Sequence, residues 1–249
     1  MQSRRMAATY AAFADAGFHV NAPDSWMAHG ISKMGIGYNE GISRLPRTES
    51  VVLYRQVAYD ALYYTLPSAT WSFLPLTGAP GSEYEPLSVH LDEFEQALST
   101  HLGFGVAAFL YQGTAMYDTP AGAALYNKWG AWFKTFRVLL STGDLIHIRR
   151  ADGQGLDAIV HVKAGASPPA LAVVWNPTDQ QISASLLVPL YYAGLRGAAT
   201  VKATFEPWPG SPPPSSVEVP LDWRARALLN VTVPARSVTW CTFEAAAAE

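Results

Sequence analysis

Residues 227–244 read ALLNVTVPARSVTWCTFE, and this stretch decides how the second half of the chain folds. Apolar and polar residues alternate on either side of Pro234-Ala235, a pair that is typical of a turn. The pattern predicts one strand at 228–233 and another at 238–243. This end of the chain is therefore expected to be all-β.

The same alternation of short strands and turns extends back to Asp144. Turn signals such as Asp152-Gly153 and Asn176-Pro177 separate further apolar runs. These runs predict six more strands: 145–148, 158–162, 171–175, 182–188, 200–205 and 217–219. Eight short strands with one half-polar face predict an antiparallel β-sandwich over residues 143–249, in which the proline-rich segment 207–216 is a surface loop.

Before residue 143 apolar strand-like runs alternate with helix-like stretches. The predicted strands are 18–22, 71–76 and 105–110, and helices are predicted to begin near Pro46, Ser88 and Thr119-Pro120. Each predicted strand is apolar on both faces, as in parallel strands that helices cover. The longest loops follow the strands, which places chemistry at the carboxyl ends of the strands. Residues 1–142 are therefore expected to form an α/β domain of about three β/α units.

Composition excludes several classes of function. The net charge is −3 and no long charge run occurs, so neither nucleic acid nor an anionic membrane is an expected partner. The one cysteine, Cys241, excludes an internal disulfide and a cysteine-rich zinc site, and we expect it to be buried in the last strand. The histidines lack metal-ligand spacing, and no apolar run is long enough to span a membrane. Neither a metal nor a cofactor is expected.

Several stretches resemble parts of known glycoside hydrolases. Residues 171–179 (LAVVWNPTD), 186–195 (LLVPLYYAGL) and 231–244 (VTVPARSVTWCTFE) resemble the β-sandwich that follows the catalytic barrel in α-galactosidase-like and α-amylase-like enzymes. In the first half, MGIGYNE, LPRTESVVLYRQVAYD, EPLSVHLDEFEQ and FGVAAFLYQGTAMYDT resemble the last part of the (β/α)₈ barrel of α-galactosidase-like hydrolases.

The resemblance implies a partial (β/α)₈ (TIM) barrel, because a complete barrel has eight β/α units and about three are predicted here. It implies the C-terminal portion of a glycoside hydrolase that acts on α-linked sugars by carboxylate acid/base chemistry. Such a portion is expected to be inactive alone and to be an enzyme only when the missing part of the barrel completes it. The alternative is a non-catalytic carbohydrate-binding or structural fragment. An open sheet also exposes its edges, so self-association is expected.

Glycosidases need two carboxyl groups on either side of the scissile bond, roughly 5–9.5 Å apart. Asp24 follows the first predicted strand, at the position where a barrel strand delivers a side chain to its pocket. Glu40 lies among glycines that let a backbone approach a ligand closely. We take these two residues as the candidate catalytic pair. The alternatives are a turn-capping role for Asp24 and a solvated surface position for Glu40.

Further residues in or near the loops after the strands are candidates for binding the sugar. They are Trp26, Tyr38, Asn39, Arg44, Glu85, His90 and Tyr111. Three of them have an alternative interpretation: a salt bridge at a helix entry for Arg44, a solvated side chain for Glu85, and a place in the first turn of a helix for His90. The aromatic residues, 12% of the chain, can stack on the apolar faces of sugars, although filling a core is their commoner role.

Overall fold

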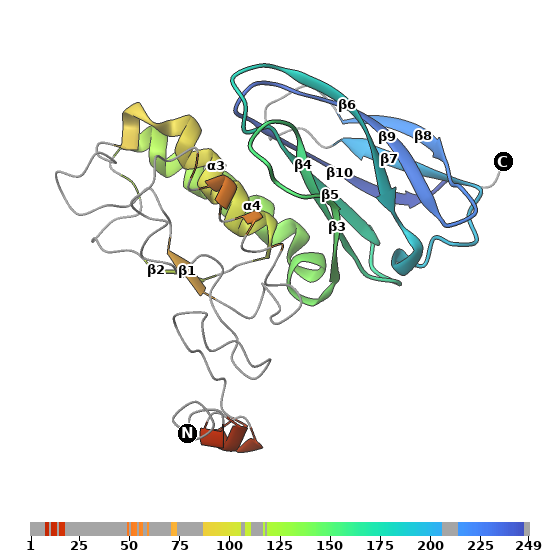
Figure 1. The fold of residues 1–249 in the computed structure, drawn as a ribbon, viewed down its shortest axis with the longest axis horizontal. Coiled ribbons are helices and arrows are strands. Elements are labelled where there is room, and N and C mark those ends of the chain that lie inside the picture. The colour runs from red at the N-terminus through yellow and green to blue at the C-terminus, as the bar shows by residue number, and fades with distance from the viewer. Residues whose placement is uncertain are drawn as a thin grey trace. The chain divides into compact units, whose positions relative to one another are not determined.

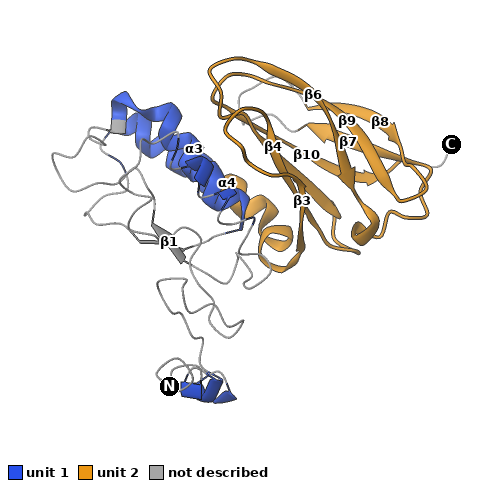
Figure 2. Cartoon of the chain, viewed as in Figure 1, with its two compact units in different colours: residues 1–130 blue, residues 131–249 orange. Residues whose placement is uncertain are grey.

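In the computed structural model the described residues are 8–9, 11–13, 15–17, 49, 51–53, 55–56, 59, 71–73, 87–105, 108–110, 117, 119–205 and 214–246. The chain divides into two compact units, Met1–Gly130 and Ala131–Glu249, shown in different colours in Figure 2. The division falls inside a helix that the sequence analysis assigned wholly to the first domain. The predicted domain ranges 1–142 and 143–249 stay a prediction.

The first unit contains a parallel pair of strands connected through a helix. Along the chain follow β1 (Trp71–Phe73), the 3₁₀ turn η4 (Leu87–Val89), α3 (Leu91–Gly103), β2 (Ala108–Leu110) and α4 (Pro120–Thr142) (Figure 1). The register pairs Trp71 with Ala108 and Phe73 with Leu110. The predicted parallel pairing is thus confirmed for two strands. The predicted strand 18–22 lies outside the described residues, and a partial (β/α)₈ barrel is not shown.

Two predicted starts of elements are wrong, that of the helix and that of the strand after it. Ser88 was expected to cap α3, but it lies within η4, and the N-cap is His90, whose side chain makes no capping hydrogen bond. Because Ser88 belongs to the 3₁₀ turn, the helix begins three residues later, at Leu91. Gly105 was expected to open a strand, but its φ of +82° places it in the left-handed region that favours glycine. Its N–H donates to the carbonyl of Leu102 at 2.9 Å, so it ends the helix.

Other local predictions for the first unit are confirmed. The Gly122 N–H donates to Thr119 Oγ1 at 3.3 Å, as expected of a capping threonine placed before Pro120. Of the predicted apolar stripe of α3, Phe94, Leu98 and Leu102 are buried and Leu91 is half-buried.

The second unit contains the end of α4 and eight strands. They are β3 (Asp144–Arg149), β4 (Asp157–Val162), β5 (Ala170–Trp175), β6 (Ile182–Pro189), β7 (Thr200–Phe205), β8 (Ser215–Pro220), β9 (Arg226–Val233) and β10 (Val238–Ala245). Each of the eight predicted strands is found, with ends that differ by at most two residues. A six-stranded sheet has the order β3-β4-β5-β10-β7-β8, and β6 pairs with β9 in a second sheet. All of these pairs are antiparallel, as predicted.

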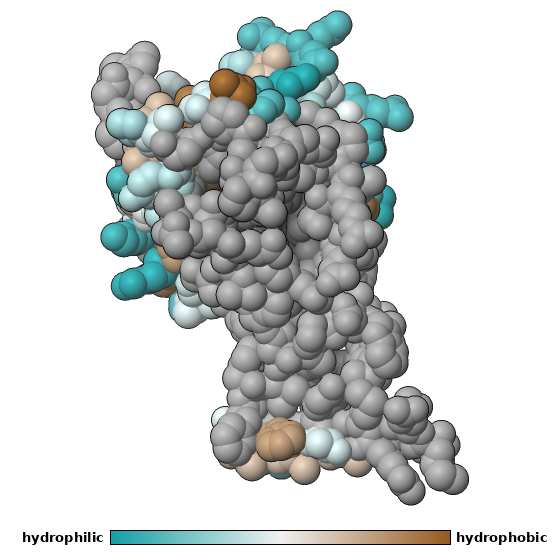
Figure 3. Space-filling view, turned by 90° about the vertical axis from the view of Figure 1, so that its left-hand side faces the viewer, coloured by the Kyte–Doolittle hydropathy of each residue, from teal (hydrophilic) through white to brown (hydrophobic). Residues whose placement is uncertain are grey.

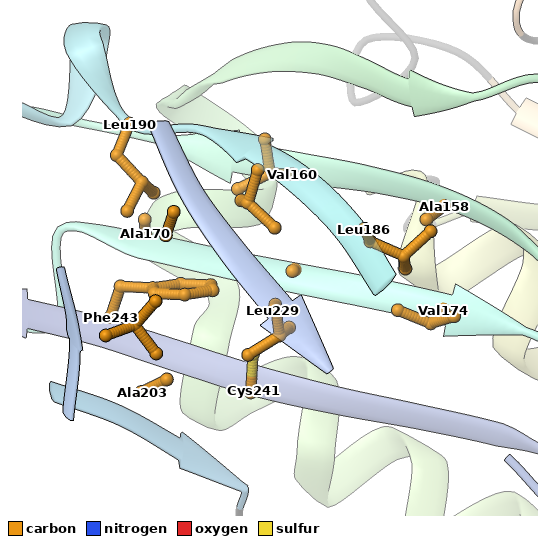
Figure 4. Close-up of a cluster of buried hydrophobic side chains, with 14 of the residues drawn as sticks. Ala158, Val160, Ala170, Val174, Leu186, Leu190, Ala203, Leu229, Cys241 and Phe243 are labelled. Carbon is orange, nitrogen blue, oxygen red and sulfur yellow. The ribbon is translucent and has the colours of Figure 1, made fainter. Parts of the chain in front are cut away.

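The two sheets share one hydrophobic core. Leu186 and Leu229, from the two-stranded sheet, lie in one buried cluster with Val160, Val174 and Phe243 of the six-stranded sheet (Figure 4). Successive side chains along a strand point to opposite faces of the sheet, which determines which of them enter the core. Leu229 is fully buried, while Leu228 is 56% exposed. Cys241 lies in the same core, which confirms its predicted burial.

The middle strands of the large sheet are buried on both faces. Every residue of β4 and β5 is buried. On the face opposite the shared core, the end of α4 packs against the sheet: the Trp132 ring meets the Trp240 ring edge-on, with centroids 5.8 Å apart. This double cover explains why these strands are apolar runs, such as ALAVVW at 170–175, instead of alternating ones.

Asn176 ties the strand ends together at one end of the second unit. Its side chain is fully buried, and its Nδ2 lies within 3.0 Å of the carbonyl oxygens of Gln180, Val233 and Pro234. Its Oδ1 accepts hydrogen bonds from the N–H and the hydroxyl of Thr178. A residue predicted only as a turn former therefore joins the ends of β5 and β9 to the turn before β6.

The surface of the described residues is mixed. On the face shown in Figure 3 hydrophilic and hydrophobic side chains are interspersed among them, without a broad hydrophobic area. None of the described helices is long and apolar enough to span a membrane.

Candidate functional site

Most of the predicted site residues cannot be placed. Only His90 belongs to the described part of the chain. The residues outside it are Asp24, Trp26, Tyr38, Asn39, Glu40, Arg44, Glu85 and Tyr111. Their convergence on a sugar pocket, including the Asp24–Glu40 pair, therefore stays a prediction.

His90 is engaged at the start of α3. Its Nδ1 lies 3.2 Å from Glu93 Oε2, and both side chains are partly exposed. Asp92 and Glu93 occupy the first helical turn, where the helix dipole favours negative charge. This contact fits the alternative that the sequence analysis kept open for His90, a local role in the first turn of the helix.

The carboxyl ends of β1 and β2 meet at one edge, because Phe73 pairs with Leu110. Catalytic and binding residues of β/α proteins gather at such an edge. Glu85 belongs to the segment after β1, and Tyr111 directly follows β2 in the sequence. The parallel register is thus the described feature that supports a site here.

Two charged residues of the first unit have structural partners. Arg55 is buried, and its Nη1 donates to Thr100 Oγ1 of α3 at 2.9 Å. Glu95 accepts hydrogen bonds from Lys128 Nζ and Trp129 Nε1, each at 3.0 Å, which joins α3 to α4. These hydrogen bonds give Glu95 a structural role between the two helices.

Within the described ranges no three histidine, cysteine or acidic side chains gather as metal ligands would.

A set of exposed aromatic and arginine residues in the second unit was not predicted from the sequence. We call it the aromatic patch: Tyr191, Tyr192, Arg196, Trp223 and Arg224. The three aromatic side chains are 47%, 63% and 83% exposed, in that order. The two tyrosine rings meet edge to face at 5.2 Å, and the Arg224 guanidinium lies 4.3 Å from the centre of the Trp223 ring. The signal in the sequence was the placement of Tyr191-Tyr192 and Trp223 in the connections between strands.

A groove lies beside the connection that carries Tyr191 and Tyr192. It has a volume of about 530 Å³ and is lined by residues of the 194–200 loop together with Ala245 and Ala246. Gly194, with φ of +80°, makes the turn at its start. Ligand pockets commonly have volumes of about 300–1,000 Å³.

No protein-family model and no curated protein matches this chain. Solved structures do. The chain is similar to the α-amylase from Geobacillus thermoleovorans complexed with acarbose, with 11% identity and a TM-score of 0.51, over 75% of this chain and 42% of the amylase. Lower TM-scores relate it to the debranching enzyme from Nostoc punctiforme (0.48, 13% identity, 77% and 40% covered) and to the pullulanase from Bacillus acidopullulyticus (0.43, 12%, 84% and 29%).

The likeness to the amylase is one of fold. The chain spans about two fifths of the length of the amylase. The mixed helices and strands with antiparallel sheets thus match the C-terminal portion of an amylase-type enzyme.

Proposed function

We propose that the chain is the C-terminal portion of a glycoside hydrolase that acts on α-linked sugars. The observation that carries the proposal is the order of elements: a parallel β–α–β unit, then an eight-stranded antiparallel module, matched over three quarters of the chain by an α-amylase. The sequence motifs resemble α-galactosidase-like hydrolases and the fold resembles an amylase. Enzymes of both kinds act on α-linked sugars, so we propose an α-glycosidic bond as the target. Experiment must identify the sugar.

The proposed chemistry needs one proton donor and one carboxylate. A carboxylic acid protonates the glycosidic oxygen of the leaving sugar while a carboxylate attacks the anomeric carbon, or activates a water that does so. Asp24 and Glu40 are the proposed pair, and Tyr38, Asn39 and Arg44 the proposed contacts to the sugar hydroxyls. No step needs an external oxidant or reductant.

The first test compares two preparations on a panel of aryl α-glycosides. One is residues 1–249, and the other is the product of the whole continuous reading frame that contains them. We expect turnover only in the second, and a loss of about 10³-fold or more in Asp24→Asn or Glu40→Gln. Matched controls are Asp15→Asn and Glu49→Gln, exposed helical carboxyls that should leave the rate unchanged.

Three results would count against the proposal. Turnover that survives both substitutions removes the assigned pair. A reading frame without further β/α units removes the partial barrel. If the protein encoded by the complete reading frame hydrolyses no α-glycoside, the proposal that it is a glycoside hydrolase is refuted.

A second candidate function is carbohydrate binding without hydrolysis. It is favoured by the exposed aromatic patch on the antiparallel module, which does not depend on the predicted carboxylates. Sugar binding by a complete but catalytically silent product would support this second function over the first.

A further inference from the structure

We propose that the aromatic patch of the second unit binds an α-linked oligosaccharide through residues other than the predicted carboxylate pair. The choice of ligand rests on the proposed function, and the existence of the surface rests on its own geometry.

The patch is built at one end of the two-stranded sheet. β6 ends where β9 begins, since Pro189 pairs with Arg226. The Leu190 N–H then donates to the carbonyl of Ala225 at 2.9 Å. This bond joins the 3₁₀ turn η5 (Tyr191–Ala193) to the turn that carries Trp223, so aromatic residues more than thirty positions apart in sequence share one end of the module.

In both connections the aliphatic side chains are buried, and the aromatic and arginine side chains of the patch are exposed. The aliphatic residues Leu190, Ala193, Leu195 and Ala225 are buried, the first three in the shared core. The tyrosines, the tryptophan and the two arginines of the patch point to solvent. An indole with 83% of its surface exposed forgoes the burial that such a ring usually obtains. Its exposed ring offers a flat apolar surface to a ligand.

Among the described residues no salt bridge neutralises the two arginines of the patch. Arg196 donates to Tyr191 Oη at 3.2 Å, and Arg224 stacks on Trp223, but within the described part of the chain neither forms a salt bridge. The one acid of this turn, Asp222, is held by Arg226, whose Nε lies 2.7 Å from its Oδ2. The remaining N–H groups of Arg196 and Arg224 are therefore available as donors beside the rings.

Flat rings with adjacent donors match a pyranose, which has an apolar C–H face and an edge of hydroxyl oxygens. Aromatic rings stack on the face, and guanidinium and phenol groups bond the edge. A protein partner would instead need a continuous apolar core with excluded water. The nearest exposed aliphatic pair along the strands is Leu187 and Leu228, on the outer face of the β6–β9 sheet. A substitution there distinguishes binding of a protein partner from binding of a sugar.

The rings are held in place before any ligand arrives. Asp222 Oδ1 accepts from the N–H groups of Arg224 and Arg226, both at 2.9 Å, which fixes the turn around Trp223. The hydrogen bond from Arg196 holds Tyr191, and the Arg224 guanidinium over its ring holds Trp223. Prior ordering of this kind reduces the entropy lost on binding.

The test is affinity electrophoresis of the full chain in gels with and without soluble starch, with maltoheptaose titrated by calorimetry. We expect retardation by starch, and binding of maltoheptaose at least about tenfold weaker in Trp223→Ala and in Tyr191→Ala/Tyr192→Ala. Leu228→Ala is the matched control, because it removes an exposed apolar side chain of the same module without touching a ring. Far-UV circular dichroism checks that each variant is folded.

The outcomes divide cleanly. No retardation of the wild type, or equal retardation of the ring variants, overturns the proposal. Loss of self-association in both the ring variants and Leu228→Ala, with unchanged starch binding, assigns the surface to a second copy and also overturns it. Starch binding that persists in Asp24→Asn/Glu40→Gln but not in Trp223→Ala supports the patch. This holds even where the complete reading frame shows no hydrolysis, so the two proposals fail separately.

Discussion

Asn176→Ala should destabilise the second unit far more than its place in a turn suggests. The amide of Asn176 bonds three carbonyl oxygens from two parts of the chain, and its oxygen accepts two bonds from Thr178. Alanine removes all of these contacts and adds none. The buried carbonyl of Val233 loses this partner in a place where water cannot readily replace it.

The expected cost can be worked out from the number of bonds. Two amide protons and one amide oxygen make about three net hydrogen bonds, each worth about 1 kcal/mol, so the unfolding free energy should fall by about 3 kcal/mol. A unit of the size of Ala131–Glu249 has an unfolding entropy of about 0.25 kcal/mol per kelvin. The midpoint of thermal unfolding should therefore fall by about 12 °C.

Thermal unfolding followed by circular dichroism measures this shift. Asn230→Ala is the control, since Asn230 is an exposed residue of β9 with one side-chain bond, to Ser185, and should lose less than about 1 kcal/mol. Asn176→Asp should be at least as harmful as Asn176→Ala, because it turns a second oxygen toward the three carbonyls. A fall of less than about 4 °C in Asn176→Ala would refute the reasoning.

Three further predictions concern packing, acid stability and association. Gly143→Ala should cost about 1–3 kcal/mol in thermal unfolding, because a Cβ there would lie 2.9 Å from the carbonyl oxygen of Val162, whereas Gly197→Ala, with no atom within 4 Å, should be neutral. The pKa of Asp152 is lowered from 3.8, chiefly by the hydrogen bond from the Gln154 N–H, and the Arg236 and Arg226 guanidinium groups lower the pKa values of Asp179 and Asp222. Groups with lowered pKa stabilise the folded state above their unfolded pKa, so stability should fall as the pH drops below about 4; an acid titration showing no loss between pH 4 and 2 would contradict this. The edge strands β3 and β8 should promote self-association, which sedimentation velocity would disprove by finding one monomer species at all concentrations.

The strands of the second unit were predictable because their signal is local. Alternation at 228–233 separates Leu228 from Leu229, and turn residues mark nearly every strand end. The pairing order was not predictable. β9 and β10 are consecutive, yet β9 pairs with β6 and β10 lies between β5 and β7. Such partners are chosen by contacts between distant segments, which a pattern within one segment does not record.

The site was less predictable than the fold for two physical reasons. At the start of α3 a 3₁₀ turn competes with the helix for the same residues, so the capping role assigned to Ser88 failed. In the second unit aromatic residues were expected mainly in cores, and the exposure of Trp223 depends on the Asp222–Arg226 contacts that shape its turn. Composition alone does not distinguish a ring that fills a core from a ring that faces water.

The single thiol of the chain can serve as an internal probe of how often the second unit opens. Cys241 lies between the two sheets, and burial raises the pKa of its thiol, so the nucleophilic thiolate hardly forms while the sheets stay together. A thiol reagent such as a chromogenic disulfide can then react only with molecules whose layers have separated. The rate of colour development would report how often that happens in the native ensemble, without any engineered label.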